Sequence, residues 1–151
     1  MGPNALSFYR AARRLQAAGV PLLPRALTTL SARLHQVHLD LRSQLGEGVE
    51  LGYGGVGVVV APGVTVGPRT FLCQNVTLGE RPDAPGVPRV GAHVLVGSGA
   101  MVLGPVTVGD HAEIGANAVV TEDVPAGAVV AGVPARVLRR KPLPAHRSVG
   151  T

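Results

Sequence analysis

The sequence has few of the residues that usually fill and crosslink a protein interior. Its 151 residues include no tryptophan and one cysteine, and the aromatic content is 3%. Small aliphatic side chains must therefore fill the core, and a hydrophobic content of 46% is enough for one domain. A single cysteine excludes an intramolecular disulfide. The N-terminus has no apolar segment behind a basic start, so we expect a cytoplasmic protein. No run of about 18 apolar residues is free of glycine and proline, which predicts no membrane span.

Acidic residues are absent from both ends of the chain. Residues 1–39 contain five arginines, and residues 136–151 contain four arginines and one lysine. Between them, residues 40–135 hold nine acidic residues and only four arginines, a formal charge of −5. The overall charge of +5 therefore does not describe a continuous basic groove, and aromatic side chains that stack on bases are scarce. We do not expect nucleic acid as a partner.

The N-terminal part has helical spacing. Two amphipathic segments lie on either side of Gly19, and the second has apolar residues at Leu27, Leu30, Leu34 and Val37. Apolar residues three and four positions apart predict two short helices.

From about residue 45 the apolar period changes to six. Every sixth residue from Val60 to Val120 is apolar, Ala84 included, and a smaller residue stands two positions before most of them. Alternation of this kind is typical of a short strand, and the glycine, asparagine or aspartate that follows allows a sharp corner. Three strands and three corners close a triangular coil of about 18 residues, and stacked coils form parallel sheets around a narrow core.

Two insertions interrupt this period. Three extra residues fall within 52–57, and the stretch LGERPDAPGVPRVG covers residues 78–91. Loops that project from a regular solenoid often carry function. The whole pattern predicts four to five coils, in three parts: a helical N-terminal segment (1–39), a β-helix domain (40–135) and a basic C-terminal tail (136–151).

Several segments resemble a known family. IGANAVVTEDVPAGAVVAGVPARVLRR (114–140) and VGSGAMVLGPVTVG (96–109) are similar to the hexapeptide-repeat acyltransferases, and LGYGGVGVVV with CQNVTLG resembles their serine acetyltransferase branch. The resemblance covers about residues 6–140. It implies an all-β solenoid, namely a left-handed parallel β-helix, assembled as a homotrimer. It further implies direct acetyl transfer from acetyl-CoA, bound between neighbouring subunits, to a small hydroxyl acceptor such as serine.

The resemblance also implies where the cofactor binds. By the family's pattern, two positions offer backbone groups to the pantetheine arm, two form a Thr-Lys pair, and two basic residues lie near the nucleotide. These positions correspond to Ser98, Ala116, Thr121, Glu122, Arg136 and Arg139. Guanidinium groups suit the phosphates of CoA. Glu122 stands where the family has lysine, which removes one cation. For Arg140 and Lys141 the alternative is a solvated chain end.

Acetyl transfer to a hydroxyl group needs a base, which a histidine held by an acid supplies in this family. The acid corresponds to Asp40, but the histidine position falls on Tyr53, and a phenol is a weak base at neutral pH. Related short members carry histidines at positions that here are alanine, one of them in the 78–91 loop. The acids of that loop are the remaining candidates. The candidate catalytic residues are Asp40, Tyr53, Glu80 and Asp83.

The histidines and the cysteine have simpler explanations. His93 and His111 follow inward positions and are expected to be exposed turn residues. His35 and His38 have a spacing that can hold a metal, but no further ligands converge with them, so we predict no metal site. His38, two residues from the candidate acid, is an alternative base. Cys73 occupies a usual glycine corner, and direct transfer needs no acyl-enzyme.

Three functions stay open at this point. The first is a serine O-acetyltransferase. The second is an N- or O-acetyltransferase acting on a sugar, where an amine acceptor would need less help from a base. The third is a catalytically impaired trimer that serves as a scaffold or binds acyl-CoA. An enzyme turns over acetyl-CoA, whereas a scaffold binds without turnover. The cluster Arg10, Arg13 and Arg14 also permits a weak membrane contact, the alternative being a docked, solvated helix.

Overall fold

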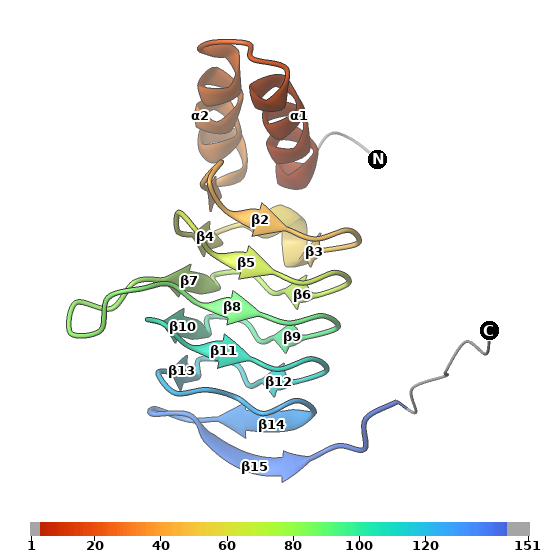
Figure 1. Cartoon of the computed structure of the whole chain (residues 1–151), viewed down its shortest axis with the longest axis vertical. Coiled ribbons are helices and arrows are strands. Elements are labelled where there is room, and N and C mark those ends of the chain that lie inside the picture. Colours follow the sequence, from red (N-terminus) through yellow and green to blue (C-terminus); the bar gives the residue numbers. More distant parts are fainter. Residues whose placement is uncertain (1–3, 145–151) are drawn as a thin grey trace.

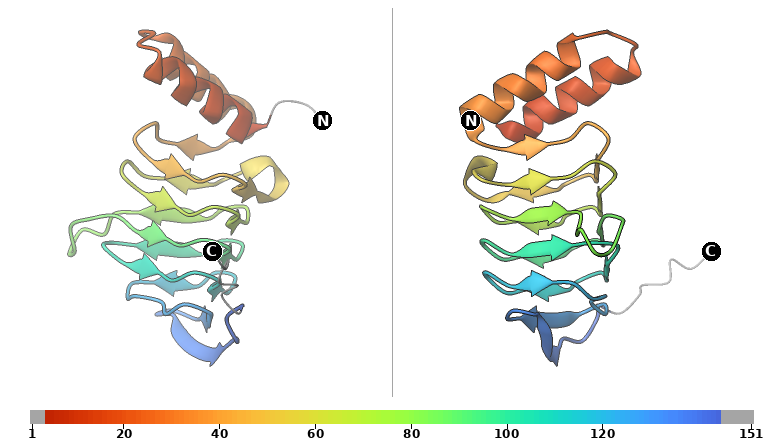
Figure 2. Two further views of the ribbon diagram at one scale, coloured as in Figure 1. Left: turned by 45° about the vertical axis from the view of Figure 1, so that its right-hand side comes forward. Right: turned by 90° about the vertical axis from the view of Figure 1, so that its left-hand side faces the viewer.

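The computed structural model describes residues 4–144 and shows a triangular prism with two helices across its N-terminal end (Figures 1 and 2). Helix α1 (Ala5–Ala17) begins after Asn4, whose side chain accepts a hydrogen bond from the Ser7 amide at 3.0 Å. Helix α2 (Leu23–His35) begins with proline in its first turn. The two predicted helices are confirmed, except that Val37 lies beyond the end of α2 and is buried in the core of the prism. No helix within residues 4–144 combines the length and apolarity needed to cross a bilayer.

The prism is built from short strands in three sheets, one for each side. Sheet A contains β1 (His38–Leu39), β4 (Val59–Val60), β7 (Thr77–Gly79), β10 (Met101–Leu103) and β13 (Val119–Val120). Sheet B contains β2 (Gln44–Leu45), β5 (Thr65–Val66), β8 (Arg89–Val90) and β11 (Thr107–Val108). Sheet C contains β3 (Glu50–Leu51), β6 (Phe71–Leu72), β9 (Leu95–Val96), β12 (Glu113–Ile114), β14 (Ala128–Ala131) and β15 (Arg136–Arg140).

Neighbouring strands are parallel, except that β15 runs antiparallel to β14. In Figure 1, β2, β5, β8 and β11 run from left to right at the front, and the chain returns behind them while it descends. The coil is therefore left-handed. The fold is a left-handed parallel β-helix of four complete coils and a shorter fifth, as the resemblance implied.

The core follows the six-residue period. The predicted inward residues, such as Val60, Leu72 and Ile114, are almost fully buried, and so are the smaller residues two positions before them. Thr70 is the polar member of this set, and its hydroxyl donates to the Gly91 carbonyl at 2.8 Å. Branched and small side chains fill an interior that is too narrow for aromatic rings.

Ala84 is the exception, and its inclusion in the period was wrong. It is only half-buried and lies in the loop between β7 and β8, not in a strand. The chain takes two hexads to pass from Leu78 to Val90, and both are inward residues of neighbouring strands. Because the insertion is one whole hexad long, it kept the apolar period in phase.

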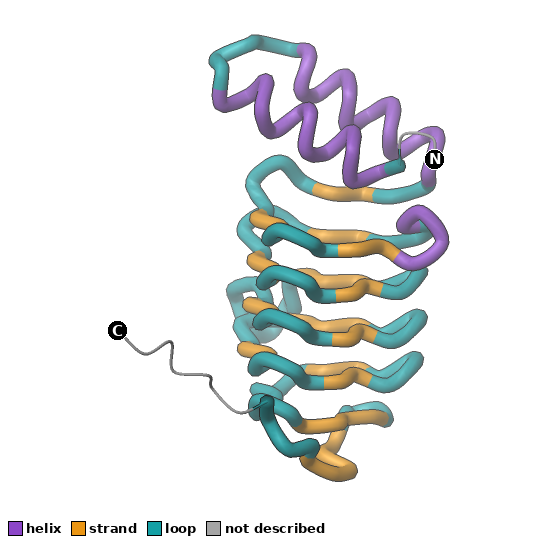
Figure 3. The backbone as a smooth tube through the Cα atoms, turned by 90° about the vertical axis from the view of Figure 1, so that its right-hand side faces the viewer, coloured by secondary structure: helices purple, strands orange, loops and turns teal. Residues whose placement is uncertain are grey.

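The corners between sheets form three edges along the prism, named here by the sheets they join in chain order: edges AB, BC and CA. The 80–88 loop projects from edge AB, where it is visible as the green loop beside β7 in Figure 1. The 52–57 insertion contains a short 3-10 turn, η1 (Gly52–Gly55), at edge CA. Figure 3 shows this turn projecting from one edge of an otherwise regular stack. The two insertions therefore leave the prism at different edges.

The two ends of the prism have features that the sequence did not predict. In α2, Leu30 and Leu34 remain 46% and 62% exposed, so its apolar face is not packed on the prism. Residues 136–140, which fall in the predicted basic tail, form β15, and the Lys141 ammonium pairs with the Glu113 carboxylate. The last part of that tail, residues 145–151, lies outside the described residues.

Candidate functional site

The candidate residues of the β-helix coils lie on the two edges that border sheet A. On edge CA are Tyr53, Ser98 and Ala116. On edge AB are Asp40, Glu80, Asp83, Thr121 and Glu122. Within one subunit sheet A separates these two groups. A single chain therefore presents two half-sites on opposite borders of one face.

The 80–88 loop is held against edge AB by Arg81. The Arg81 Nε atom pairs with Asp83 Oδ1 at 2.7 Å, and Nη1 donates to the Thr121 carbonyl at 3.5 Å. The loop crosses Gly104, where an added Cβ would already be in van der Waals contact with Arg81. This arrangement joins the acidic loop to the Thr121 position, 40 residues away in the chain. Arg81 was not among the residues predicted from the sequence, where its only signal was a cation between the two acids Glu80 and Asp83.

The cofactor candidates lie in the last coils. The Asn117 amide donates to the Ser98 carbonyl at 2.8 Å, so Ser98 and the exposed Ala116 occupy stacked corners of successive coils. Gly97 allows this close stacking, because an added Cβ would lie 2.6 Å from the Ala116 nitrogen. On edge AB, Glu122 forms an ion pair of 3.6 Å with Arg136, and both side chains are mostly exposed.

Arg139 lies on β15 together with Arg136. It pairs in register with Val129 of β14, and its side chain is exposed. The strand therefore presents both predicted phosphate ligands at the C-terminal end of the prism.

The candidate acid Asp40 is already engaged by a neighbour. Its Oδ1 accepts from the Arg42 amide at 2.8 Å and from Nε at 3.1 Å, and Oδ2 accepts from Nη2 at 3.2 Å. The hydrogen bonds from the Arg42 side chain lower the pKa of Asp40, and partial burial opposes this only in part. Tyr53 is 86% exposed with a φ of 49° and lies on the other edge. The structure does not join these two residues into an acid–base pair within one subunit.

The Asp40 environment gives a first prediction. Replacing Arg42 with glutamine removes the cation and its charged hydrogen bonds, so the pKa of Asp40 should rise, as followed by carboxyl NMR titration. A pKa below its unfolded value means that the pair stabilises the fold at higher pH. That contribution is lost as the pH falls through the folded-state pKa. Arg25 lines a shallow cleft together with Asp40 and Arg42, so Arg25→Gln is the control. An equal shift in both variants would contradict the assignment.

Three of the described histidines lie apart from these half-sites, whereas His38 stands two residues before Asp40 and its charge helps to lower the pKa of Asp40. His93 and His111 are turn residues on edge BC with φ of 55° and 60°, and their rings stack 4.8 Å apart at 6°. The predicted turn conformation is confirmed. His35 packs beside Phe8 in the helical cap, and the side chain of His38 is exposed on β1. In residues 4–144 no group of three His, Cys, Asp or Glu side chains is placed to hold a metal ion.

A left-handed prism of hexads with its candidate ligands at the corners defines the class of hexapeptide-repeat proteins. Residues 88–122 match the family model described as bacterial transferase hexapeptide (six repeats). A serine acetyltransferase of Helicobacter pylori strain J99 is 34% identical over 92% of this chain and 82% of its own length. One of Synechococcus elongatus is 38% identical over 92% of this chain. The chain belongs to the serine acetyltransferase family.

Solved structures agree with this assignment. The serine acetyltransferase of Brucella abortus strain S19, in complex with coenzyme A, superposes with a TM-score of 0.85 at 31% identity over 91% of this chain. The chain spans 56% of that protein and 57% of the Synechococcus relative. The match therefore covers the prism and the helices of this chain, but only part of each longer relative.

Proposed function

We propose that this protein is an acetyl-CoA-dependent serine O-acetyltransferase whose active site forms between subunits. The observation that carries the proposal is the division of the candidate residues between the two borders of sheet A. Family membership supplies the reaction class, because the relatives carry the name serine acetyltransferase and one is in complex with coenzyme A. The comparisons give no support to a sugar acceptor or to an impaired homologue.

A homotrimer with sheet A facing the symmetry axis would complete the site. After His38 on β1, the outward residues of the other sheet A strands are uncharged. Two of them, Val59 and Met101, are 39% and 43% exposed. Sheets B and C instead present charges in the same rows, at Arg89 and Glu113. Cyclic symmetry brings one border of a face against the other border of the next copy. Edge CA of each subunit would then meet edge AB of its neighbour.

In this arrangement acetyl-CoA lies along the cleft between two prisms. Ser98 and Ala116 of one subunit offer backbone groups to the amides of the pantetheine arm, opposite Thr121 and Glu122 of the next. Arg136 and Arg139 lie at the C-terminal end, where guanidinium groups can bind the CoA phosphates. The ion pair between Glu122 and Arg136 is exposed, so its loss on phosphate binding costs little.

The acceptor would lie between Tyr53 of one subunit and the 80–88 loop of the next. Asp83 is paired with Arg81 and Asp40 with Arg42, whereas Glu80 is exposed and forms no ion pair within residues 4–144. We therefore assign the base to Glu80. It takes the proton of the serine hydroxyl while the oxygen attacks the thioester carbonyl. The C–S bond then breaks, and the CoA thiolate leaves and takes up a proton, giving O-acetylserine and CoA.

Release of CoA from acetyl-CoA tests the proposal directly. Purified protein is followed with a thiol reagent in the presence of serine, homoserine or amino sugars, and CoA binding is measured by calorimetry alongside. Turnover that depends on serine is the expected result. Tight CoA binding without turnover with any acceptor would overturn it in favour of the scaffold hypothesis. The reaction is compatible with the cytoplasmic location expected from the sequence.

The cofactor assignment predicts the effect of Arg136→Ala. Loss of one charge-assisted contact to phosphate should weaken CoA binding by about tenfold or more. Assembly should not change, because the Arg136 side chain is 60% exposed at the end of the prism. Calorimetry and light scattering measure the two properties, with Arg33→Ala in α2 as the control. Unchanged CoA affinity would remove Arg136 from the site.

A further inference from the structure

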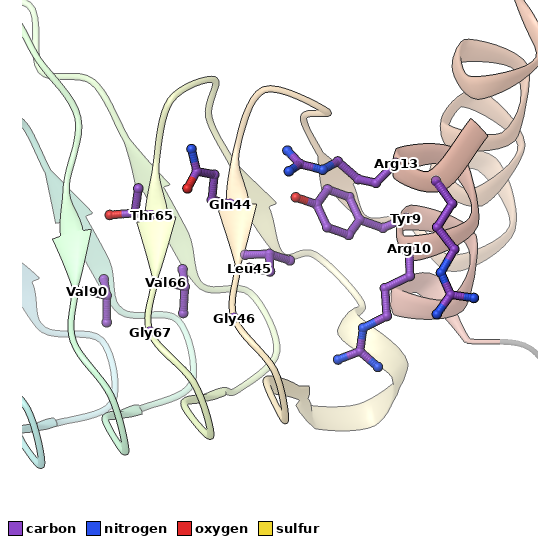
Figure 4. A pocket seen from close by; sticks show the side chains of 11 residues that line it. Tyr9, Arg10, Arg13, Gln44, Leu45, Gly46, Thr65, Val66, Gly67 and Val90 are labelled. Carbon is purple, nitrogen blue, oxygen red and sulfur yellow. The ribbon is translucent and has the colours of Figure 1, made fainter. Parts of the chain in front are cut away.

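A second cleft lies at the opposite end of the prism from the CoA candidates. It has a volume of about 550 Å³ and opens between α1 and the first strands of sheet B (Figure 4). Tyr9 and Arg13 project from the helix toward Gln44 and Thr65 on the strands, and Arg10 extends below them (Figure 4). Arg14 also lines the cleft, and none of the lining residues is acidic. It is therefore a positively charged concavity.

The helix wall of the cleft is held in place by one buried and two part-buried hydrogen bonds. Arg13 Nη1 donates to the carbonyls of Leu41 and Ser43 at 3.0 and 2.7 Å, and the Tyr9 hydroxyl donates to the same Ser43 carbonyl at 2.7 Å. These bonds fix α1 on the first coil. They also fix one of the three guanidinium groups at the back of the cleft before any ligand arrives.

The other two arginines have no counter-charge. Within residues 4–144, neither Arg10 nor Arg14 takes part in an ion pair, and both side chains are exposed. They stand four residues apart on one helix, a spacing at which like charges repel. Residues 4–39 contain no acidic residue that would relieve this repulsion. A bound anion would relieve it.

We propose that this cleft binds a small phosphorylated molecule, with its phosphate group between Arg10, Arg13 and Arg14. Planar guanidinium groups match the geometry of phosphate oxygens and remain charged at any physiological pH. The Gln44 amide and the Thr65 hydroxyl on the opposite wall offer hydrogen bonds to the rest of the ligand. A concave site between a helix and a sheet suits a small molecule better than a flat membrane surface.

This site is independent of the proposed acetyltransferase site. The cleft lies against sheet B beside the first coils, whereas the CoA candidates Ser98, Ala116 and Arg136 belong to later coils (Figure 1). The acceptor candidates, Tyr53 and the 80–88 loop, lie on edges CA and AB, the two borders of sheet A. It opens on sheet B, so a trimer that buries sheet A leaves it accessible. Failure of one proposal would leave the other standing.

The test uses inorganic pyrophosphate as the probe, with acetate at equal ionic strength for comparison. We expect saturable binding of one pyrophosphate per subunit by calorimetry. The double variant Arg10→Gln with Arg14→Gln should lose affinity by at least about tenfold. The matched control is Arg25→Gln with Arg33→Gln, which removes the same charge from the neighbouring helix and should bind like the unaltered protein. Circular dichroism verifies that both variants are folded.

Four results would overturn the proposal. The first is the absence of saturable binding, and the second is an equal loss of affinity in both double variants. The third is displacement of pyrophosphate by CoA, which would place the probe at the Arg136 end. The fourth is binding to vesicles containing anionic lipid with no binding of soluble pyrophosphate, which would assign α1 to a membrane contact instead.

Discussion

Replacing Gly67 with alanine should lower the melting temperature by on the order of 10 °C, corresponding to about 3 kcal/mol. An added Cβ would lie 2.5 Å from the carbonyl carbon of Gly91 and 2.6 Å from the nitrogen of Ala92. Both are backbone atoms of the next coil. That coil is fixed from both sides, since Gly67 donates to Val90 and Gly91 donates to Val108, each at 2.8 Å. Neither coil can move without breaking the parallel ladder.

Gly19→Ala is the control for this prediction. Gly19 has a φ of 75° in the connection between the helices, and an added Cβ there would meet nothing within 4 Å. Its replacement carries only the cost of a left-handed backbone, about 1 kcal/mol. Thermal unfolding followed by circular dichroism compares the two variants. Similar decreases in melting temperature would show that the close spacing of the coils does not depend on Gly67.

Replacing Met101 with glutamate should convert the proposed trimer to monomers and abolish CoA turnover. Met101 lies at the middle of the uncharged outer row of sheet A, so three carboxylates would meet near the proposed symmetry axis. Burying unpaired charges of one sign costs several kcal/mol, which is enough to break most subunit contacts. Turnover should disappear with assembly, because edge CA would lose its partner edge AB.

Leu95→Glu is a closely matched control. Leu95 is on the outer row of sheet C and is 41% exposed, against 43% for Met101. It carries the same change in charge on a face that the proposed trimer leaves free. Light scattering gives the mass of each variant, and the thiol assay gives its turnover. A trimeric Met101→Glu protein, or a monomeric Leu95→Glu protein, would show that another sheet forms the interface.

The sequence predicted the solenoid well because its geometry repeats. A coil with three sides needs an inward residue at every sixth position. Residues such as Leu72 and Ile114 can therefore be assigned to the core without any long-range information. The same logic misplaced Ala84, since an insertion as long as the repeat leaves no phase shift. It also gave no information on the packing of α2, because amphipathic spacing identifies the apolar face of a helix but not a surface that covers it.

The site was less accessible from the sequence. Which edge a corner occupies depends on every insertion before it, so the separation of Tyr53 from Glu80 appears only when the coils are counted in three dimensions. The contact between Arg81 and Thr121 spans two coils of the stack and follows no periodic pattern. The engagement of Asp40 by Arg42 depends on side-chain orientation at a corner, which hydrophobic periodicity does not describe.

The reversal of β15 has a consequence for how the protein behaves at high concentration. A parallel solenoid ends in an open ladder of backbone groups, on which another molecule can stack to begin a fibre. Here the last strand turns back antiparallel on β14, and it carries three exposed arginines, Arg136, Arg139 and Arg140. A second copy that approached with this same end would meet like charge. We therefore expect this end of the prism to disfavour polymerisation.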